Sequence, residues 1–200
     1  MINYSYLALG DSYTIGEQVS FADNFPNQTV QQLRKTGFQF YAPEIIAKTG
    51  WTTDELSHAI ENTAFLKKYD IVSLLIGVNN QYRGRSAPEF KIEFEHLLQN
   101  AIQFAGNNPG HVFVLSIPDW GVTPFAEGRD RKQVTTEIDA FNRVCNNSAI
   151  AFQTHFINIT DSQRADGNKK EYVAPDGLHP SEREYKKWAD KFTDAILKVL

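Results

Sequence analysis

The sequence predicts a doubly wound α/β/α sandwich, in which a five-stranded and mostly parallel sheet lies between two layers of helices. Its apolar, β-branched runs are continuous rather than alternating, which is typical of parallel strands covered on both faces. Segments with helical spacing separate these runs, so the order of elements is βαβαβαβαβα. Crossovers between parallel strands are right-handed, which favours the doubly wound arrangement. With 200 residues, 42% of them hydrophobic, the chain can bury one core, and we expect a single domain over residues 1–200.

The expected strands are short apolar segments bounded by turn residues. Four of them are distinct, and they are Tyr6–Leu9, Ile71–Ile76, Val112–Ile117 and Phe156–Ile159. A fifth lies less distinctly within residues 38–47. Together they account for the five strands of the predicted sheet.

The expected helices are recognised by their start signals and by apolar residues at helical intervals. A Ser or Thr followed three residues later by Glu, which is the pattern of a capping box, occurs at Ser86/Glu89, Thr52/Glu55 and Ser181/Glu184. Pro26 and Gly37 delimit a shorter helix, and residues 130–150 carry a further apolar stripe. Each helix follows a strand, as the sandwich requires.

The charge balance excludes several classes of partner. The chain has 20 Lys and Arg residues against 24 Asp and Glu residues, for a net charge of -4. This balance argues against a protein that binds nucleic acid or anionic membranes. The lone cysteine, Cys145, rules out an intrachain disulfide, and we expect it to be a buried thiol within a helix.

Targeting signals are not evident in the sequence. The first six residues lack a basic segment, and the apolar run after them is too short for a leader peptide. No run approaches the eighteen or so apolar residues of a membrane helix. We therefore expect a cytoplasmic protein without stable membrane insertion.

Polar residues follow several predicted strands at the point where each strand ends. These segments are Gly10-Asp11-Ser12, residues 48–52, residues 77–80 and residues 174–180. Because the carboxyl ends of parallel strands meet at one edge of the sheet, we expect these segments to lie close together. Taken singly, each segment is also typical of a turn or a helix cap, so their joint placement is the informative feature.

A nucleophilic serine needs a base and an acid that orients the base. His179 follows a turn-rich loop with Asp176 three residues upstream, so one loop can present the carboxylate to the imidazole. An imidazole held in this way can take a proton from Ser12 and later return it to the leaving alcohol. The other four histidines lie in predicted helices or near strand starts, and none forms an HExxH zinc motif.

For Ser12 to attack an ester carbonyl, hydrogen-bond donors are also needed where the tetrahedral oxyanion forms. The backbone N–H of Ser12 and that of Gly50 are candidates, because glycine lets a substrate approach the backbone. The side-chain amide of Asn79 is the third candidate. The predicted oxyanion hole therefore consists of Ser12, Gly50 and Asn79.

These residues together resemble the GDSL or SGNH hydrolases, a family of esterases, lipases and lysophospholipase-like acylhydrolases. The resemblance spans nearly the whole chain and is carried, in order, by Gly10-Asp11-Ser12 with Gly16, by Gly50, by Gly77-x-Asn79 and by Asp176-x-x-His179-Pro180. It implies a flavodoxin-like SGNH hydrolase fold. It also implies that Ser12 is the nucleophile, that His179 and Asp176 are the base and its orienting acid, and that Ser12, Gly50 and Asn79 stabilise the oxyanion.

Two positions depart from the pattern of the family. Tyr13 stands where the family name has leucine, which is expected to change packing beside the nucleophile rather than chemistry. Asn80 stands where many relatives have aspartate, so the hydrogen bonding that positions Asn79 differs.

The substrate is less well defined by the sequence than the reaction. Trp51, Trp120 and Phe125 follow strand ends and are candidate substrate-binding residues, although packing of these rings against the sheet is equally compatible. Without a long apolar lid, we expect a shallow groove that prefers short acyl chains. The expected partner is a small-molecule ester of a lipid, an acetylated sugar or another metabolite, and the mechanism needs no metal or organic cofactor.

Two other functions are compatible with the same sequence. An acyltransferase passes its acyl group to an alcohol other than water through the same acyl-enzyme. A catalytically silent relative that binds carbohydrate or lipid keeps the fold without the reaction. The presence of both Ser12 and His179 favours the hydrolase.

Overall fold

The sheet of this protein is five-stranded and parallel throughout. The structure, a computed structural model, describes residues 3–200. Its strands are β2 (Tyr6–Asp11), β4 (Glu44–Lys48), β5 (Ile71–Leu75), β6 (Val112–Leu115) and β7 (His155–Ile157). They lie in the order β4-β2-β5-β6-β7, which is the flavodoxin-like doubly wound order. The predicted fold class is therefore confirmed.

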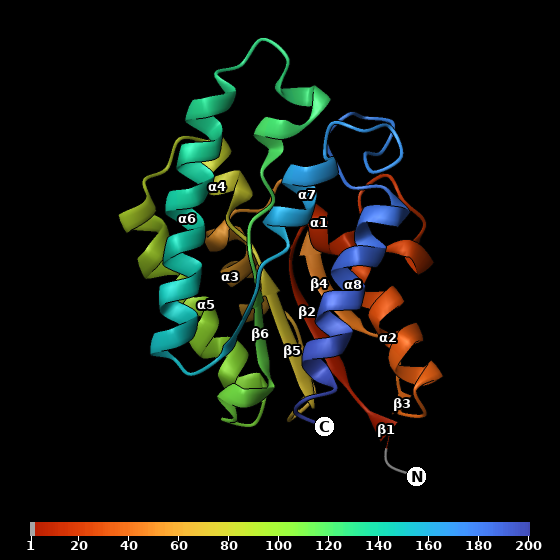
Figure 1. The fold of residues 1–200 in the computed structure, drawn as a ribbon. Coiled ribbons are helices and arrows are strands. Elements are labelled where there is room, and N and C mark those ends of the chain that lie inside the picture. Colours follow the sequence, from red (N-terminus) through yellow and green to blue (C-terminus); the bar gives the residue numbers. More distant parts are fainter. Residues whose placement is uncertain (1–2) are drawn as a thin grey trace.

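The helices form two layers, one on each face of the sheet (Figure 1). Helices α2 (Phe25–Lys35) and α8 (Glu182–Ile196) pack against each other on one face. Helices α3 (Thr53–Glu61), α5 (Ala87–Phe104) and α6 (Arg131–Ala151) cover the other face. The site at the carboxyl edge of the strands therefore sits on a scaffold supported from both sides.

Several short elements were not predicted. They are β1 (Asn3–Tyr4) and β3 (Gln39–Phe40), which pair with each other, the helices α1 (Ser12–Ile15), α4 (Val78–Tyr82) and α7 (Thr160–Asp166), and the 3₁₀ turns Phe21–Asp23, Pro109–His111, Trp120–Val122 and Pro124–Ala126. Elements of two to seven residues give too few apolar repeats for periodicity to register. Four of them carry candidate site residues, namely α1, α4 and the 3₁₀ turns Trp120–Val122 and Pro124–Ala126.

Of the three predicted capping boxes, two are present and the third is wrong. The boxes at Ser86/Glu89 and Thr52/Glu55 begin α5 and α3. At the start of α8, Ser181 donates its hydroxyl to the carbonyl of Glu171 instead, at 2.6 Å. Glu184 is buried and accepts from the indole N–H of Trp188 at 2.9 Å. Other hydrogen-bond partners of Ser181 and Glu184 thus replace the capping box at the start of α8.

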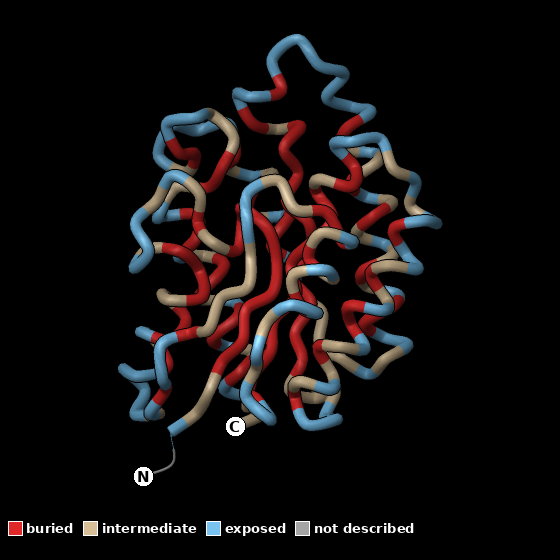
Figure 2. The backbone as a smooth tube through the Cα atoms, turned by 180° about the vertical axis from the view of Figure 1, so that it is seen from behind, coloured by how far each residue is buried: buried red, intermediate tan, exposed pale blue. Residues whose placement is uncertain are grey.

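The interior of the sheet is filled by β2, β5 and β6, in which every residue is buried (Figure 2). Strand β2 is hydrogen-bonded to β4 on one side and to β5 on the other. Cys145 faces this core from α6 and is fully buried, as expected, and burial raises the pKa of its thiol. The continuous apolar runs of the sequence correspond to strands with no solvent-facing side.

Gly10 is required by a close approach near the end of β2. A Cβ at this position would lie 2.1 Å from Oγ1 of Thr14 and 2.5 Å from the backbone oxygen of Leu75. The backbone oxygen belongs to the neighbouring strand and cannot move without disturbing the sheet. The glycine therefore lets the chain turn from β2 into α1 against β5.

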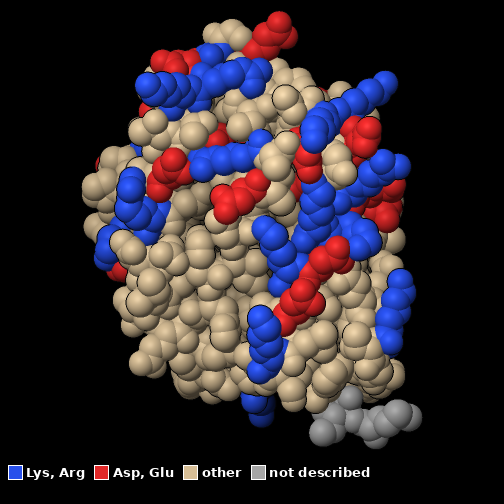
Figure 3. Space-filling view, in the orientation of Figure 1, with Lys and Arg blue, Asp and Glu red and all other residues tan. Residues whose placement is uncertain are grey.

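Charged side chains of both signs are interspersed on the face shown in Figure 3. This face presents no broad basic surface of the kind that binds polyanions. Among residues 3–200, no helix combines the length and apolarity that a membrane crossing requires.

Replacing Gly10 by alanine is expected to destabilise the fold by about 1–3 kcal/mol, because the added methyl group overlaps Thr14 and Leu75. Urea unfolding monitored by circular dichroism measures the change. Gly110→Ala is the matched control, since its Cβ would meet only the side chain of Asn108, at 3.3 Å. Equal stability of the two variants would contradict the steric account.

Candidate active site

Ser12 is held at the junction of β2 and α1, as the first residue of the helix. Asp11 caps this helix, because its Oδ1 accepts a hydrogen bond from the backbone N–H of Tyr13 at 3.0 Å. The helix ends after one turn at Gly16, which has a φ of 79° in the left-handed region. The strand and the cap together fix where the Ser12 hydroxyl lies.

The structure brings Ser12, His179 and Asp176 into one line of hydrogen bonds. His179 Nε2 lies 2.9 Å from Oγ of Ser12, although the two residues are 167 positions apart. His179 Nδ1 lies 2.6 Å from Oδ2 of Asp176. This is the connectivity of a serine nucleophile, a base and an orienting carboxylate.

The loop that carries Asp176 and His179 is held by hydrogen bonds among its own residues. Oδ1 of Asp176 accepts from the backbone N–H groups of Leu178 at 2.9 Å and of His179 at 3.0 Å. The N–H of Ala174 donates to the carbonyl of His179 at 2.8 Å. Burial opposes ionisation of Asp176, but hydrogen bonds from the His179 ring and from these backbone groups outweigh it and lower its pKa. The carboxylate is therefore ionised at neutral pH.

The segment after β4 is tied to α4 by two bonds. The Asn79 side chain donates to the carbonyl of Trp51 at 2.9 Å, and the guanidinium of Arg83 donates to the carbonyl of Gly50 at 2.7 Å. Gly50 has a φ of 82°, which favours glycine. These bonds hold the carbonyls of Gly50 and Trp51, and within residues 3–200 the N–H of Gly50 donates no backbone hydrogen bond.

Asn80, which follows Asn79 in α4, is fully buried beside α3. Its Oδ1 accepts from the N–H of Thr53 at 3.1 Å, and its Nδ2 donates to the Thr53 hydroxyl at 2.6 Å. The amide therefore anchors α4 to the start of α3 and holds the neighbouring Asn79 in place.

A cavity of about 180 Å³ opens beside these groups. Its polar end includes Ser12, His179, Gly50 and Asn79. The predicted nucleophile, base and oxyanion donors therefore share one space. Asp176 stands behind the His179 ring rather than in the cavity.

The rest of the cavity wall is mainly apolar. Val78, Tyr82, Trp120, Phe125 and Leu178 line it. Trp120 and Phe125 were predicted from the sequence, whereas five other lining residues were missed, namely Tyr13, Thr49, Val78, Tyr82 and Leu178. Two of the missed residues could have been found from their positions in the sequence. Val78 and Tyr82 lie in the same short helix, α4, as the predicted donor Asn79.

Trp51 was predicted as a substrate-binding residue, but it lies outside the cavity lining. Its half-buried ring packs against the core, and its contribution to the site is the carbonyl that accepts from Asn79. The aromatic residue next to Gly50 is thus a support for the segment rather than a wall of the pocket.

Other titratable side chains have structural partners in the fold. His111 Nδ1 lies 2.7 Å from the carbonyl of Asp70, and His155 Nε2 lies 2.9 Å from that of Gly110. Arg85 pairs with Asp54 at 2.7 Å. In the described part of the chain, no cluster of three or more His, Cys, Asp or Glu side chains has a geometry that fits a metal ion.

Asp11 differs from Asp176 in its surroundings, although both lie close to Ser12. Asp11 is fully buried, and within residues 3–200 no hydrogen-bond partner reaches its Oδ2. Desolvation raises its pKa from 3.8 to about 7, against the opposing effect of the N–H of Tyr13. The two carboxyl groups therefore have opposite tendencies to ionise near neutral pH.

The fold and this geometry define a class of protein, namely a doubly wound α/β protein with a serine, a histidine and a carboxylate aligned at the carboxyl edge of its sheet. The sequence profile of the GDSL-like Lipase/Acylhydrolase family matches residues 8–187. The chain belongs to this family, which places it among the carboxylic ester hydrolases.

Solved structures with the same fold are similar over almost the full length of both chains. A lipase/acylhydrolase from Enterococcus faecalis has a TM-score of 0.78 at 19% identity and covers 100% of this chain and 97% of its own. TesA has a TM-score of 0.77 at 18% identity, with coverages of 98% and 99%. Axe2, an acetylxylan esterase from Geobacillus stearothermophilus, has 0.75 at 18% identity, with coverages of 96% and 94%.

At these identities the likeness concerns the fold. None of the curated proteins compared with this chain matches it significantly.

Asp11→Asn is expected to change how stability depends on pH. The raised pKa of Asp11 means that its stabilising contribution is present below about pH 4 and is lost as the pH rises toward about 7. The unfolding free energy of the wild type should therefore fall relative to the variant, by up to about 1.4 kcal/mol per pH unit. Urea unfolding at pH 5, 6 and 7 measures the difference.

Asp194→Asn, which removes an exposed carboxylate from α8, serves as the control for that series. Parallel stability curves for the wild type and Asp11→Asn would contradict the buried-carboxyl account.

Proposed function

We propose that this protein is a serine esterase that hydrolyses small carboxylic esters through an acyl-enzyme on Ser12. The observation that carries the proposal is the pair of distances at His179, 2.9 Å to Oγ of Ser12 and 2.6 Å to Oδ2 of Asp176. Both lie within hydrogen-bond reach, which a nucleophile and its base require.

In the first step, Oγ of Ser12 attacks the ester carbonyl carbon while its proton passes to Nε2 of His179. The Nδ1–H of His179 donates to the ionised Asp176, which holds the tautomer and stabilises the imidazolium. The imidazolium then gives its proton to the leaving alcohol as the carbon–oxygen bond breaks. Ser12 is left acylated.

In the second step, water replaces the alcohol. Nε2 of His179 takes a proton from the water as its oxygen attacks the acyl carbon, and the proton then passes to Oγ of Ser12 as the acid departs. All proton transfers use one ring nitrogen. Apart from the water that is consumed, the scheme uses only groups of this chain.

The negative oxygen of both tetrahedral intermediates faces the N–H groups of Ser12 and Gly50 and the side-chain amide of Asn79. Support comes from their common cavity and from the bonds that hold the Gly50 segment against α4. Preorganised donors of this kind contribute roughly a hundred- to a thousand-fold each to turnover.

The acyl group is proposed to be short. A cavity of about 180 Å³ corresponds to the liquid volume of about six water molecules, which is small beside the pockets that take drug-sized ligands. Its apolar wall suits an alkyl chain, and its polar end suits the ester carbonyl. Axe2, one of the structurally similar proteins, is an acetylxylan esterase, which is consistent with an acetyl ester as substrate.

The test is hydrolysis of p-nitrophenyl acetate by the wild type, Ser12→Ala and His179→Ala. Both variants are expected to lose activity by at least about ten-thousand-fold, because nucleophile and base act as one unit. Circular dichroism checks that each variant folds. Ser57→Ala, at a position on α3 outside the cavity, should retain full activity. Activity that survives in Ser12→Ala would contradict the proposal.

A further inference from the structure

Trp120 stands between the active-site cavity and a second hollow on the surface. Its buried side chain lines the cavity that contains Ser12. It also lines an open groove of about 470 Å³, whose other residues include Gln81, Gln133 and Glu137. A change in the position of the indole would therefore enlarge one of the two hollows and reduce the other.

A chain of hydrogen bonds holds the indole in this place. Nε1–H of Trp120 donates to Oε1 of Gln81 at 2.7 Å, and Nε2 of Gln81 donates to Oε2 of Glu137 at 2.7 Å. The remaining oxygen of Glu137 accepts from Nε2 of Gln133 at 2.8 Å. Since an indole N–H only donates and a carboxylate only accepts, the Gln81 amide has one orientation that satisfies both neighbours.

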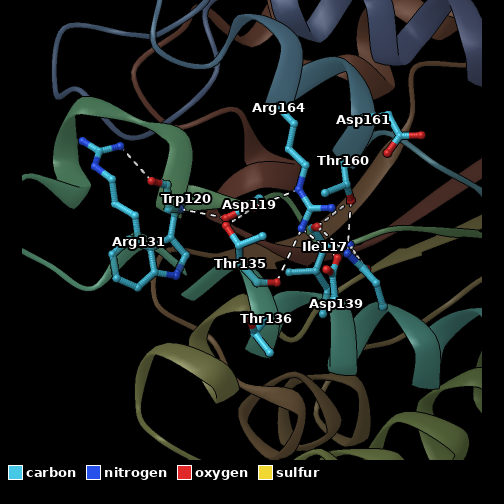
Figure 4. A network of polar contacts seen from close by, with 12 residues as sticks. Ile117, Asp119, Trp120, Arg131, Thr135, Thr136, Asp139, Thr160, Asp161 and Arg164 are labelled. Carbon is cyan, nitrogen blue, oxygen red and sulfur yellow. Dashed lines mark hydrogen bonds and ion pairs between the residues drawn. The ribbon is translucent and has the colours of Figure 1, made fainter. Parts of the chain in front are cut away.

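The backbone on either side of Trp120 is fixed separately (Figure 4). Buried Asp119 accepts from the N–H of Gly121 at 2.9 Å, from the Thr135 hydroxyl at 2.8 Å and from Nε of Arg164 at 2.8 Å. The guanidinium of Arg131 donates to the carbonyl of Gly121 at 2.7 Å. With the backbone held in this way, the freedom that remains is rotation of the Trp120 side chain. The bond to Gln81 restrains this rotation, together with edge-on packing against the rings of Tyr82 and Phe125.

We propose that Gln81 and Glu137 are positioning residues that hold Trp120 as the end wall of the acyl cavity and thereby set the longest acyl chain that is hydrolysed. The inference rests on the proposed esterase function. Without its acceptor, the buried indole N–H is unpaired, which favours rotation of the ring toward the solvent-open groove. The cavity then joins the groove, and a longer chain fits.

The test exchanges the hydrogen-bond donor and acceptor between Gln81 and Glu137. Gln81→Glu places two carboxylates where the 2.7 Å bond now lies, and their repulsion should push the side chain of residue 81 away from Glu137 and out of reach of the indole N–H. Adding Glu137→Gln supplies a donor again, so the double variant should restore the chain of hydrogen bonds. The readout is the ratio of kcat/KM for p-nitrophenyl octanoate to that for p-nitrophenyl acetate.

We expect this ratio to rise about tenfold or more in Gln81→Glu and in Trp120→Ala, and to return to the wild-type value in the double variant. Gln99→Glu makes the same chemical change on the exposed side of α5 and should leave the ratio unchanged. A fall in both activities by the same factor, without rescue, would overturn the inference, because a merely structural role predicts that result.

Hydrogen exchange of the Trp120 indole N–H, identified by its loss in Trp120→Phe, reports on the chain without catalysis. Exchange should be slow in the wild type and the double variant and fast in Gln81→Glu. Equal exchange in all three would overturn the inference even if the esterase function holds. A folded wild type that hydrolyses neither ester would instead overturn the proposed function, and the inference with it.

Discussion

The close approach at Gly10 determines where β2 ends and Ser12 begins, between the ends of the two neighbouring strands. The absence of a side chain there lets β2 run against the Leu75 carbonyl of β5 and turn at once into α1. Gly10 is level with Ala47 of β4 and with Leu75 of β5, so the segments that follow these two strands emerge on either side of Ser12. Those segments carry Gly50 and Asn79, and parallel pairing alone is enough to bring them together.

The two carboxyl groups near Ser12 differ in pKa because their surroundings differ. Asp176 accepts hydrogen bonds from the His179 ring and two backbone N–H groups, which lower its pKa. Asp11 is fully buried, and the hydrogen bond from the N–H of Tyr13 does not offset its desolvation, so its pKa rises to about 7. These surroundings suit Asp176 to the orienting role proposed for it, whereas the buried Asp11 caps α1.

The sequence predicted those features of the fold and the site that depend on residues close together in the chain. The strands around Leu9 and Leu74 were predicted because buried parallel strands are apolar on both faces. Ser12, Gly50 and Asn79 were predicted to meet because each follows a strand, and the cavity contains all three. His179 lines the same cavity, although α7 separates its loop from β7.

Features that depend on distant partners were missed or misplaced. Gln81 bonds to residues 39 and 56 positions away, and no local pattern marks it. Trp51 was assigned to the pocket because of its place beside Gly50, whereas the tertiary structure turns its ring toward the core. Ser181 found a partner in Glu171 that competes with the local cap.

Trapping the acyl-enzyme tests the central claim most directly. The protein is mixed with p-nitrophenyl butyrate, quenched with acid during turnover, and analysed by intact mass and peptide mapping. The account predicts one butyryl group per molecule, on Ser12. An acyl group found on another residue, or an active enzyme that never carries one, would contradict it.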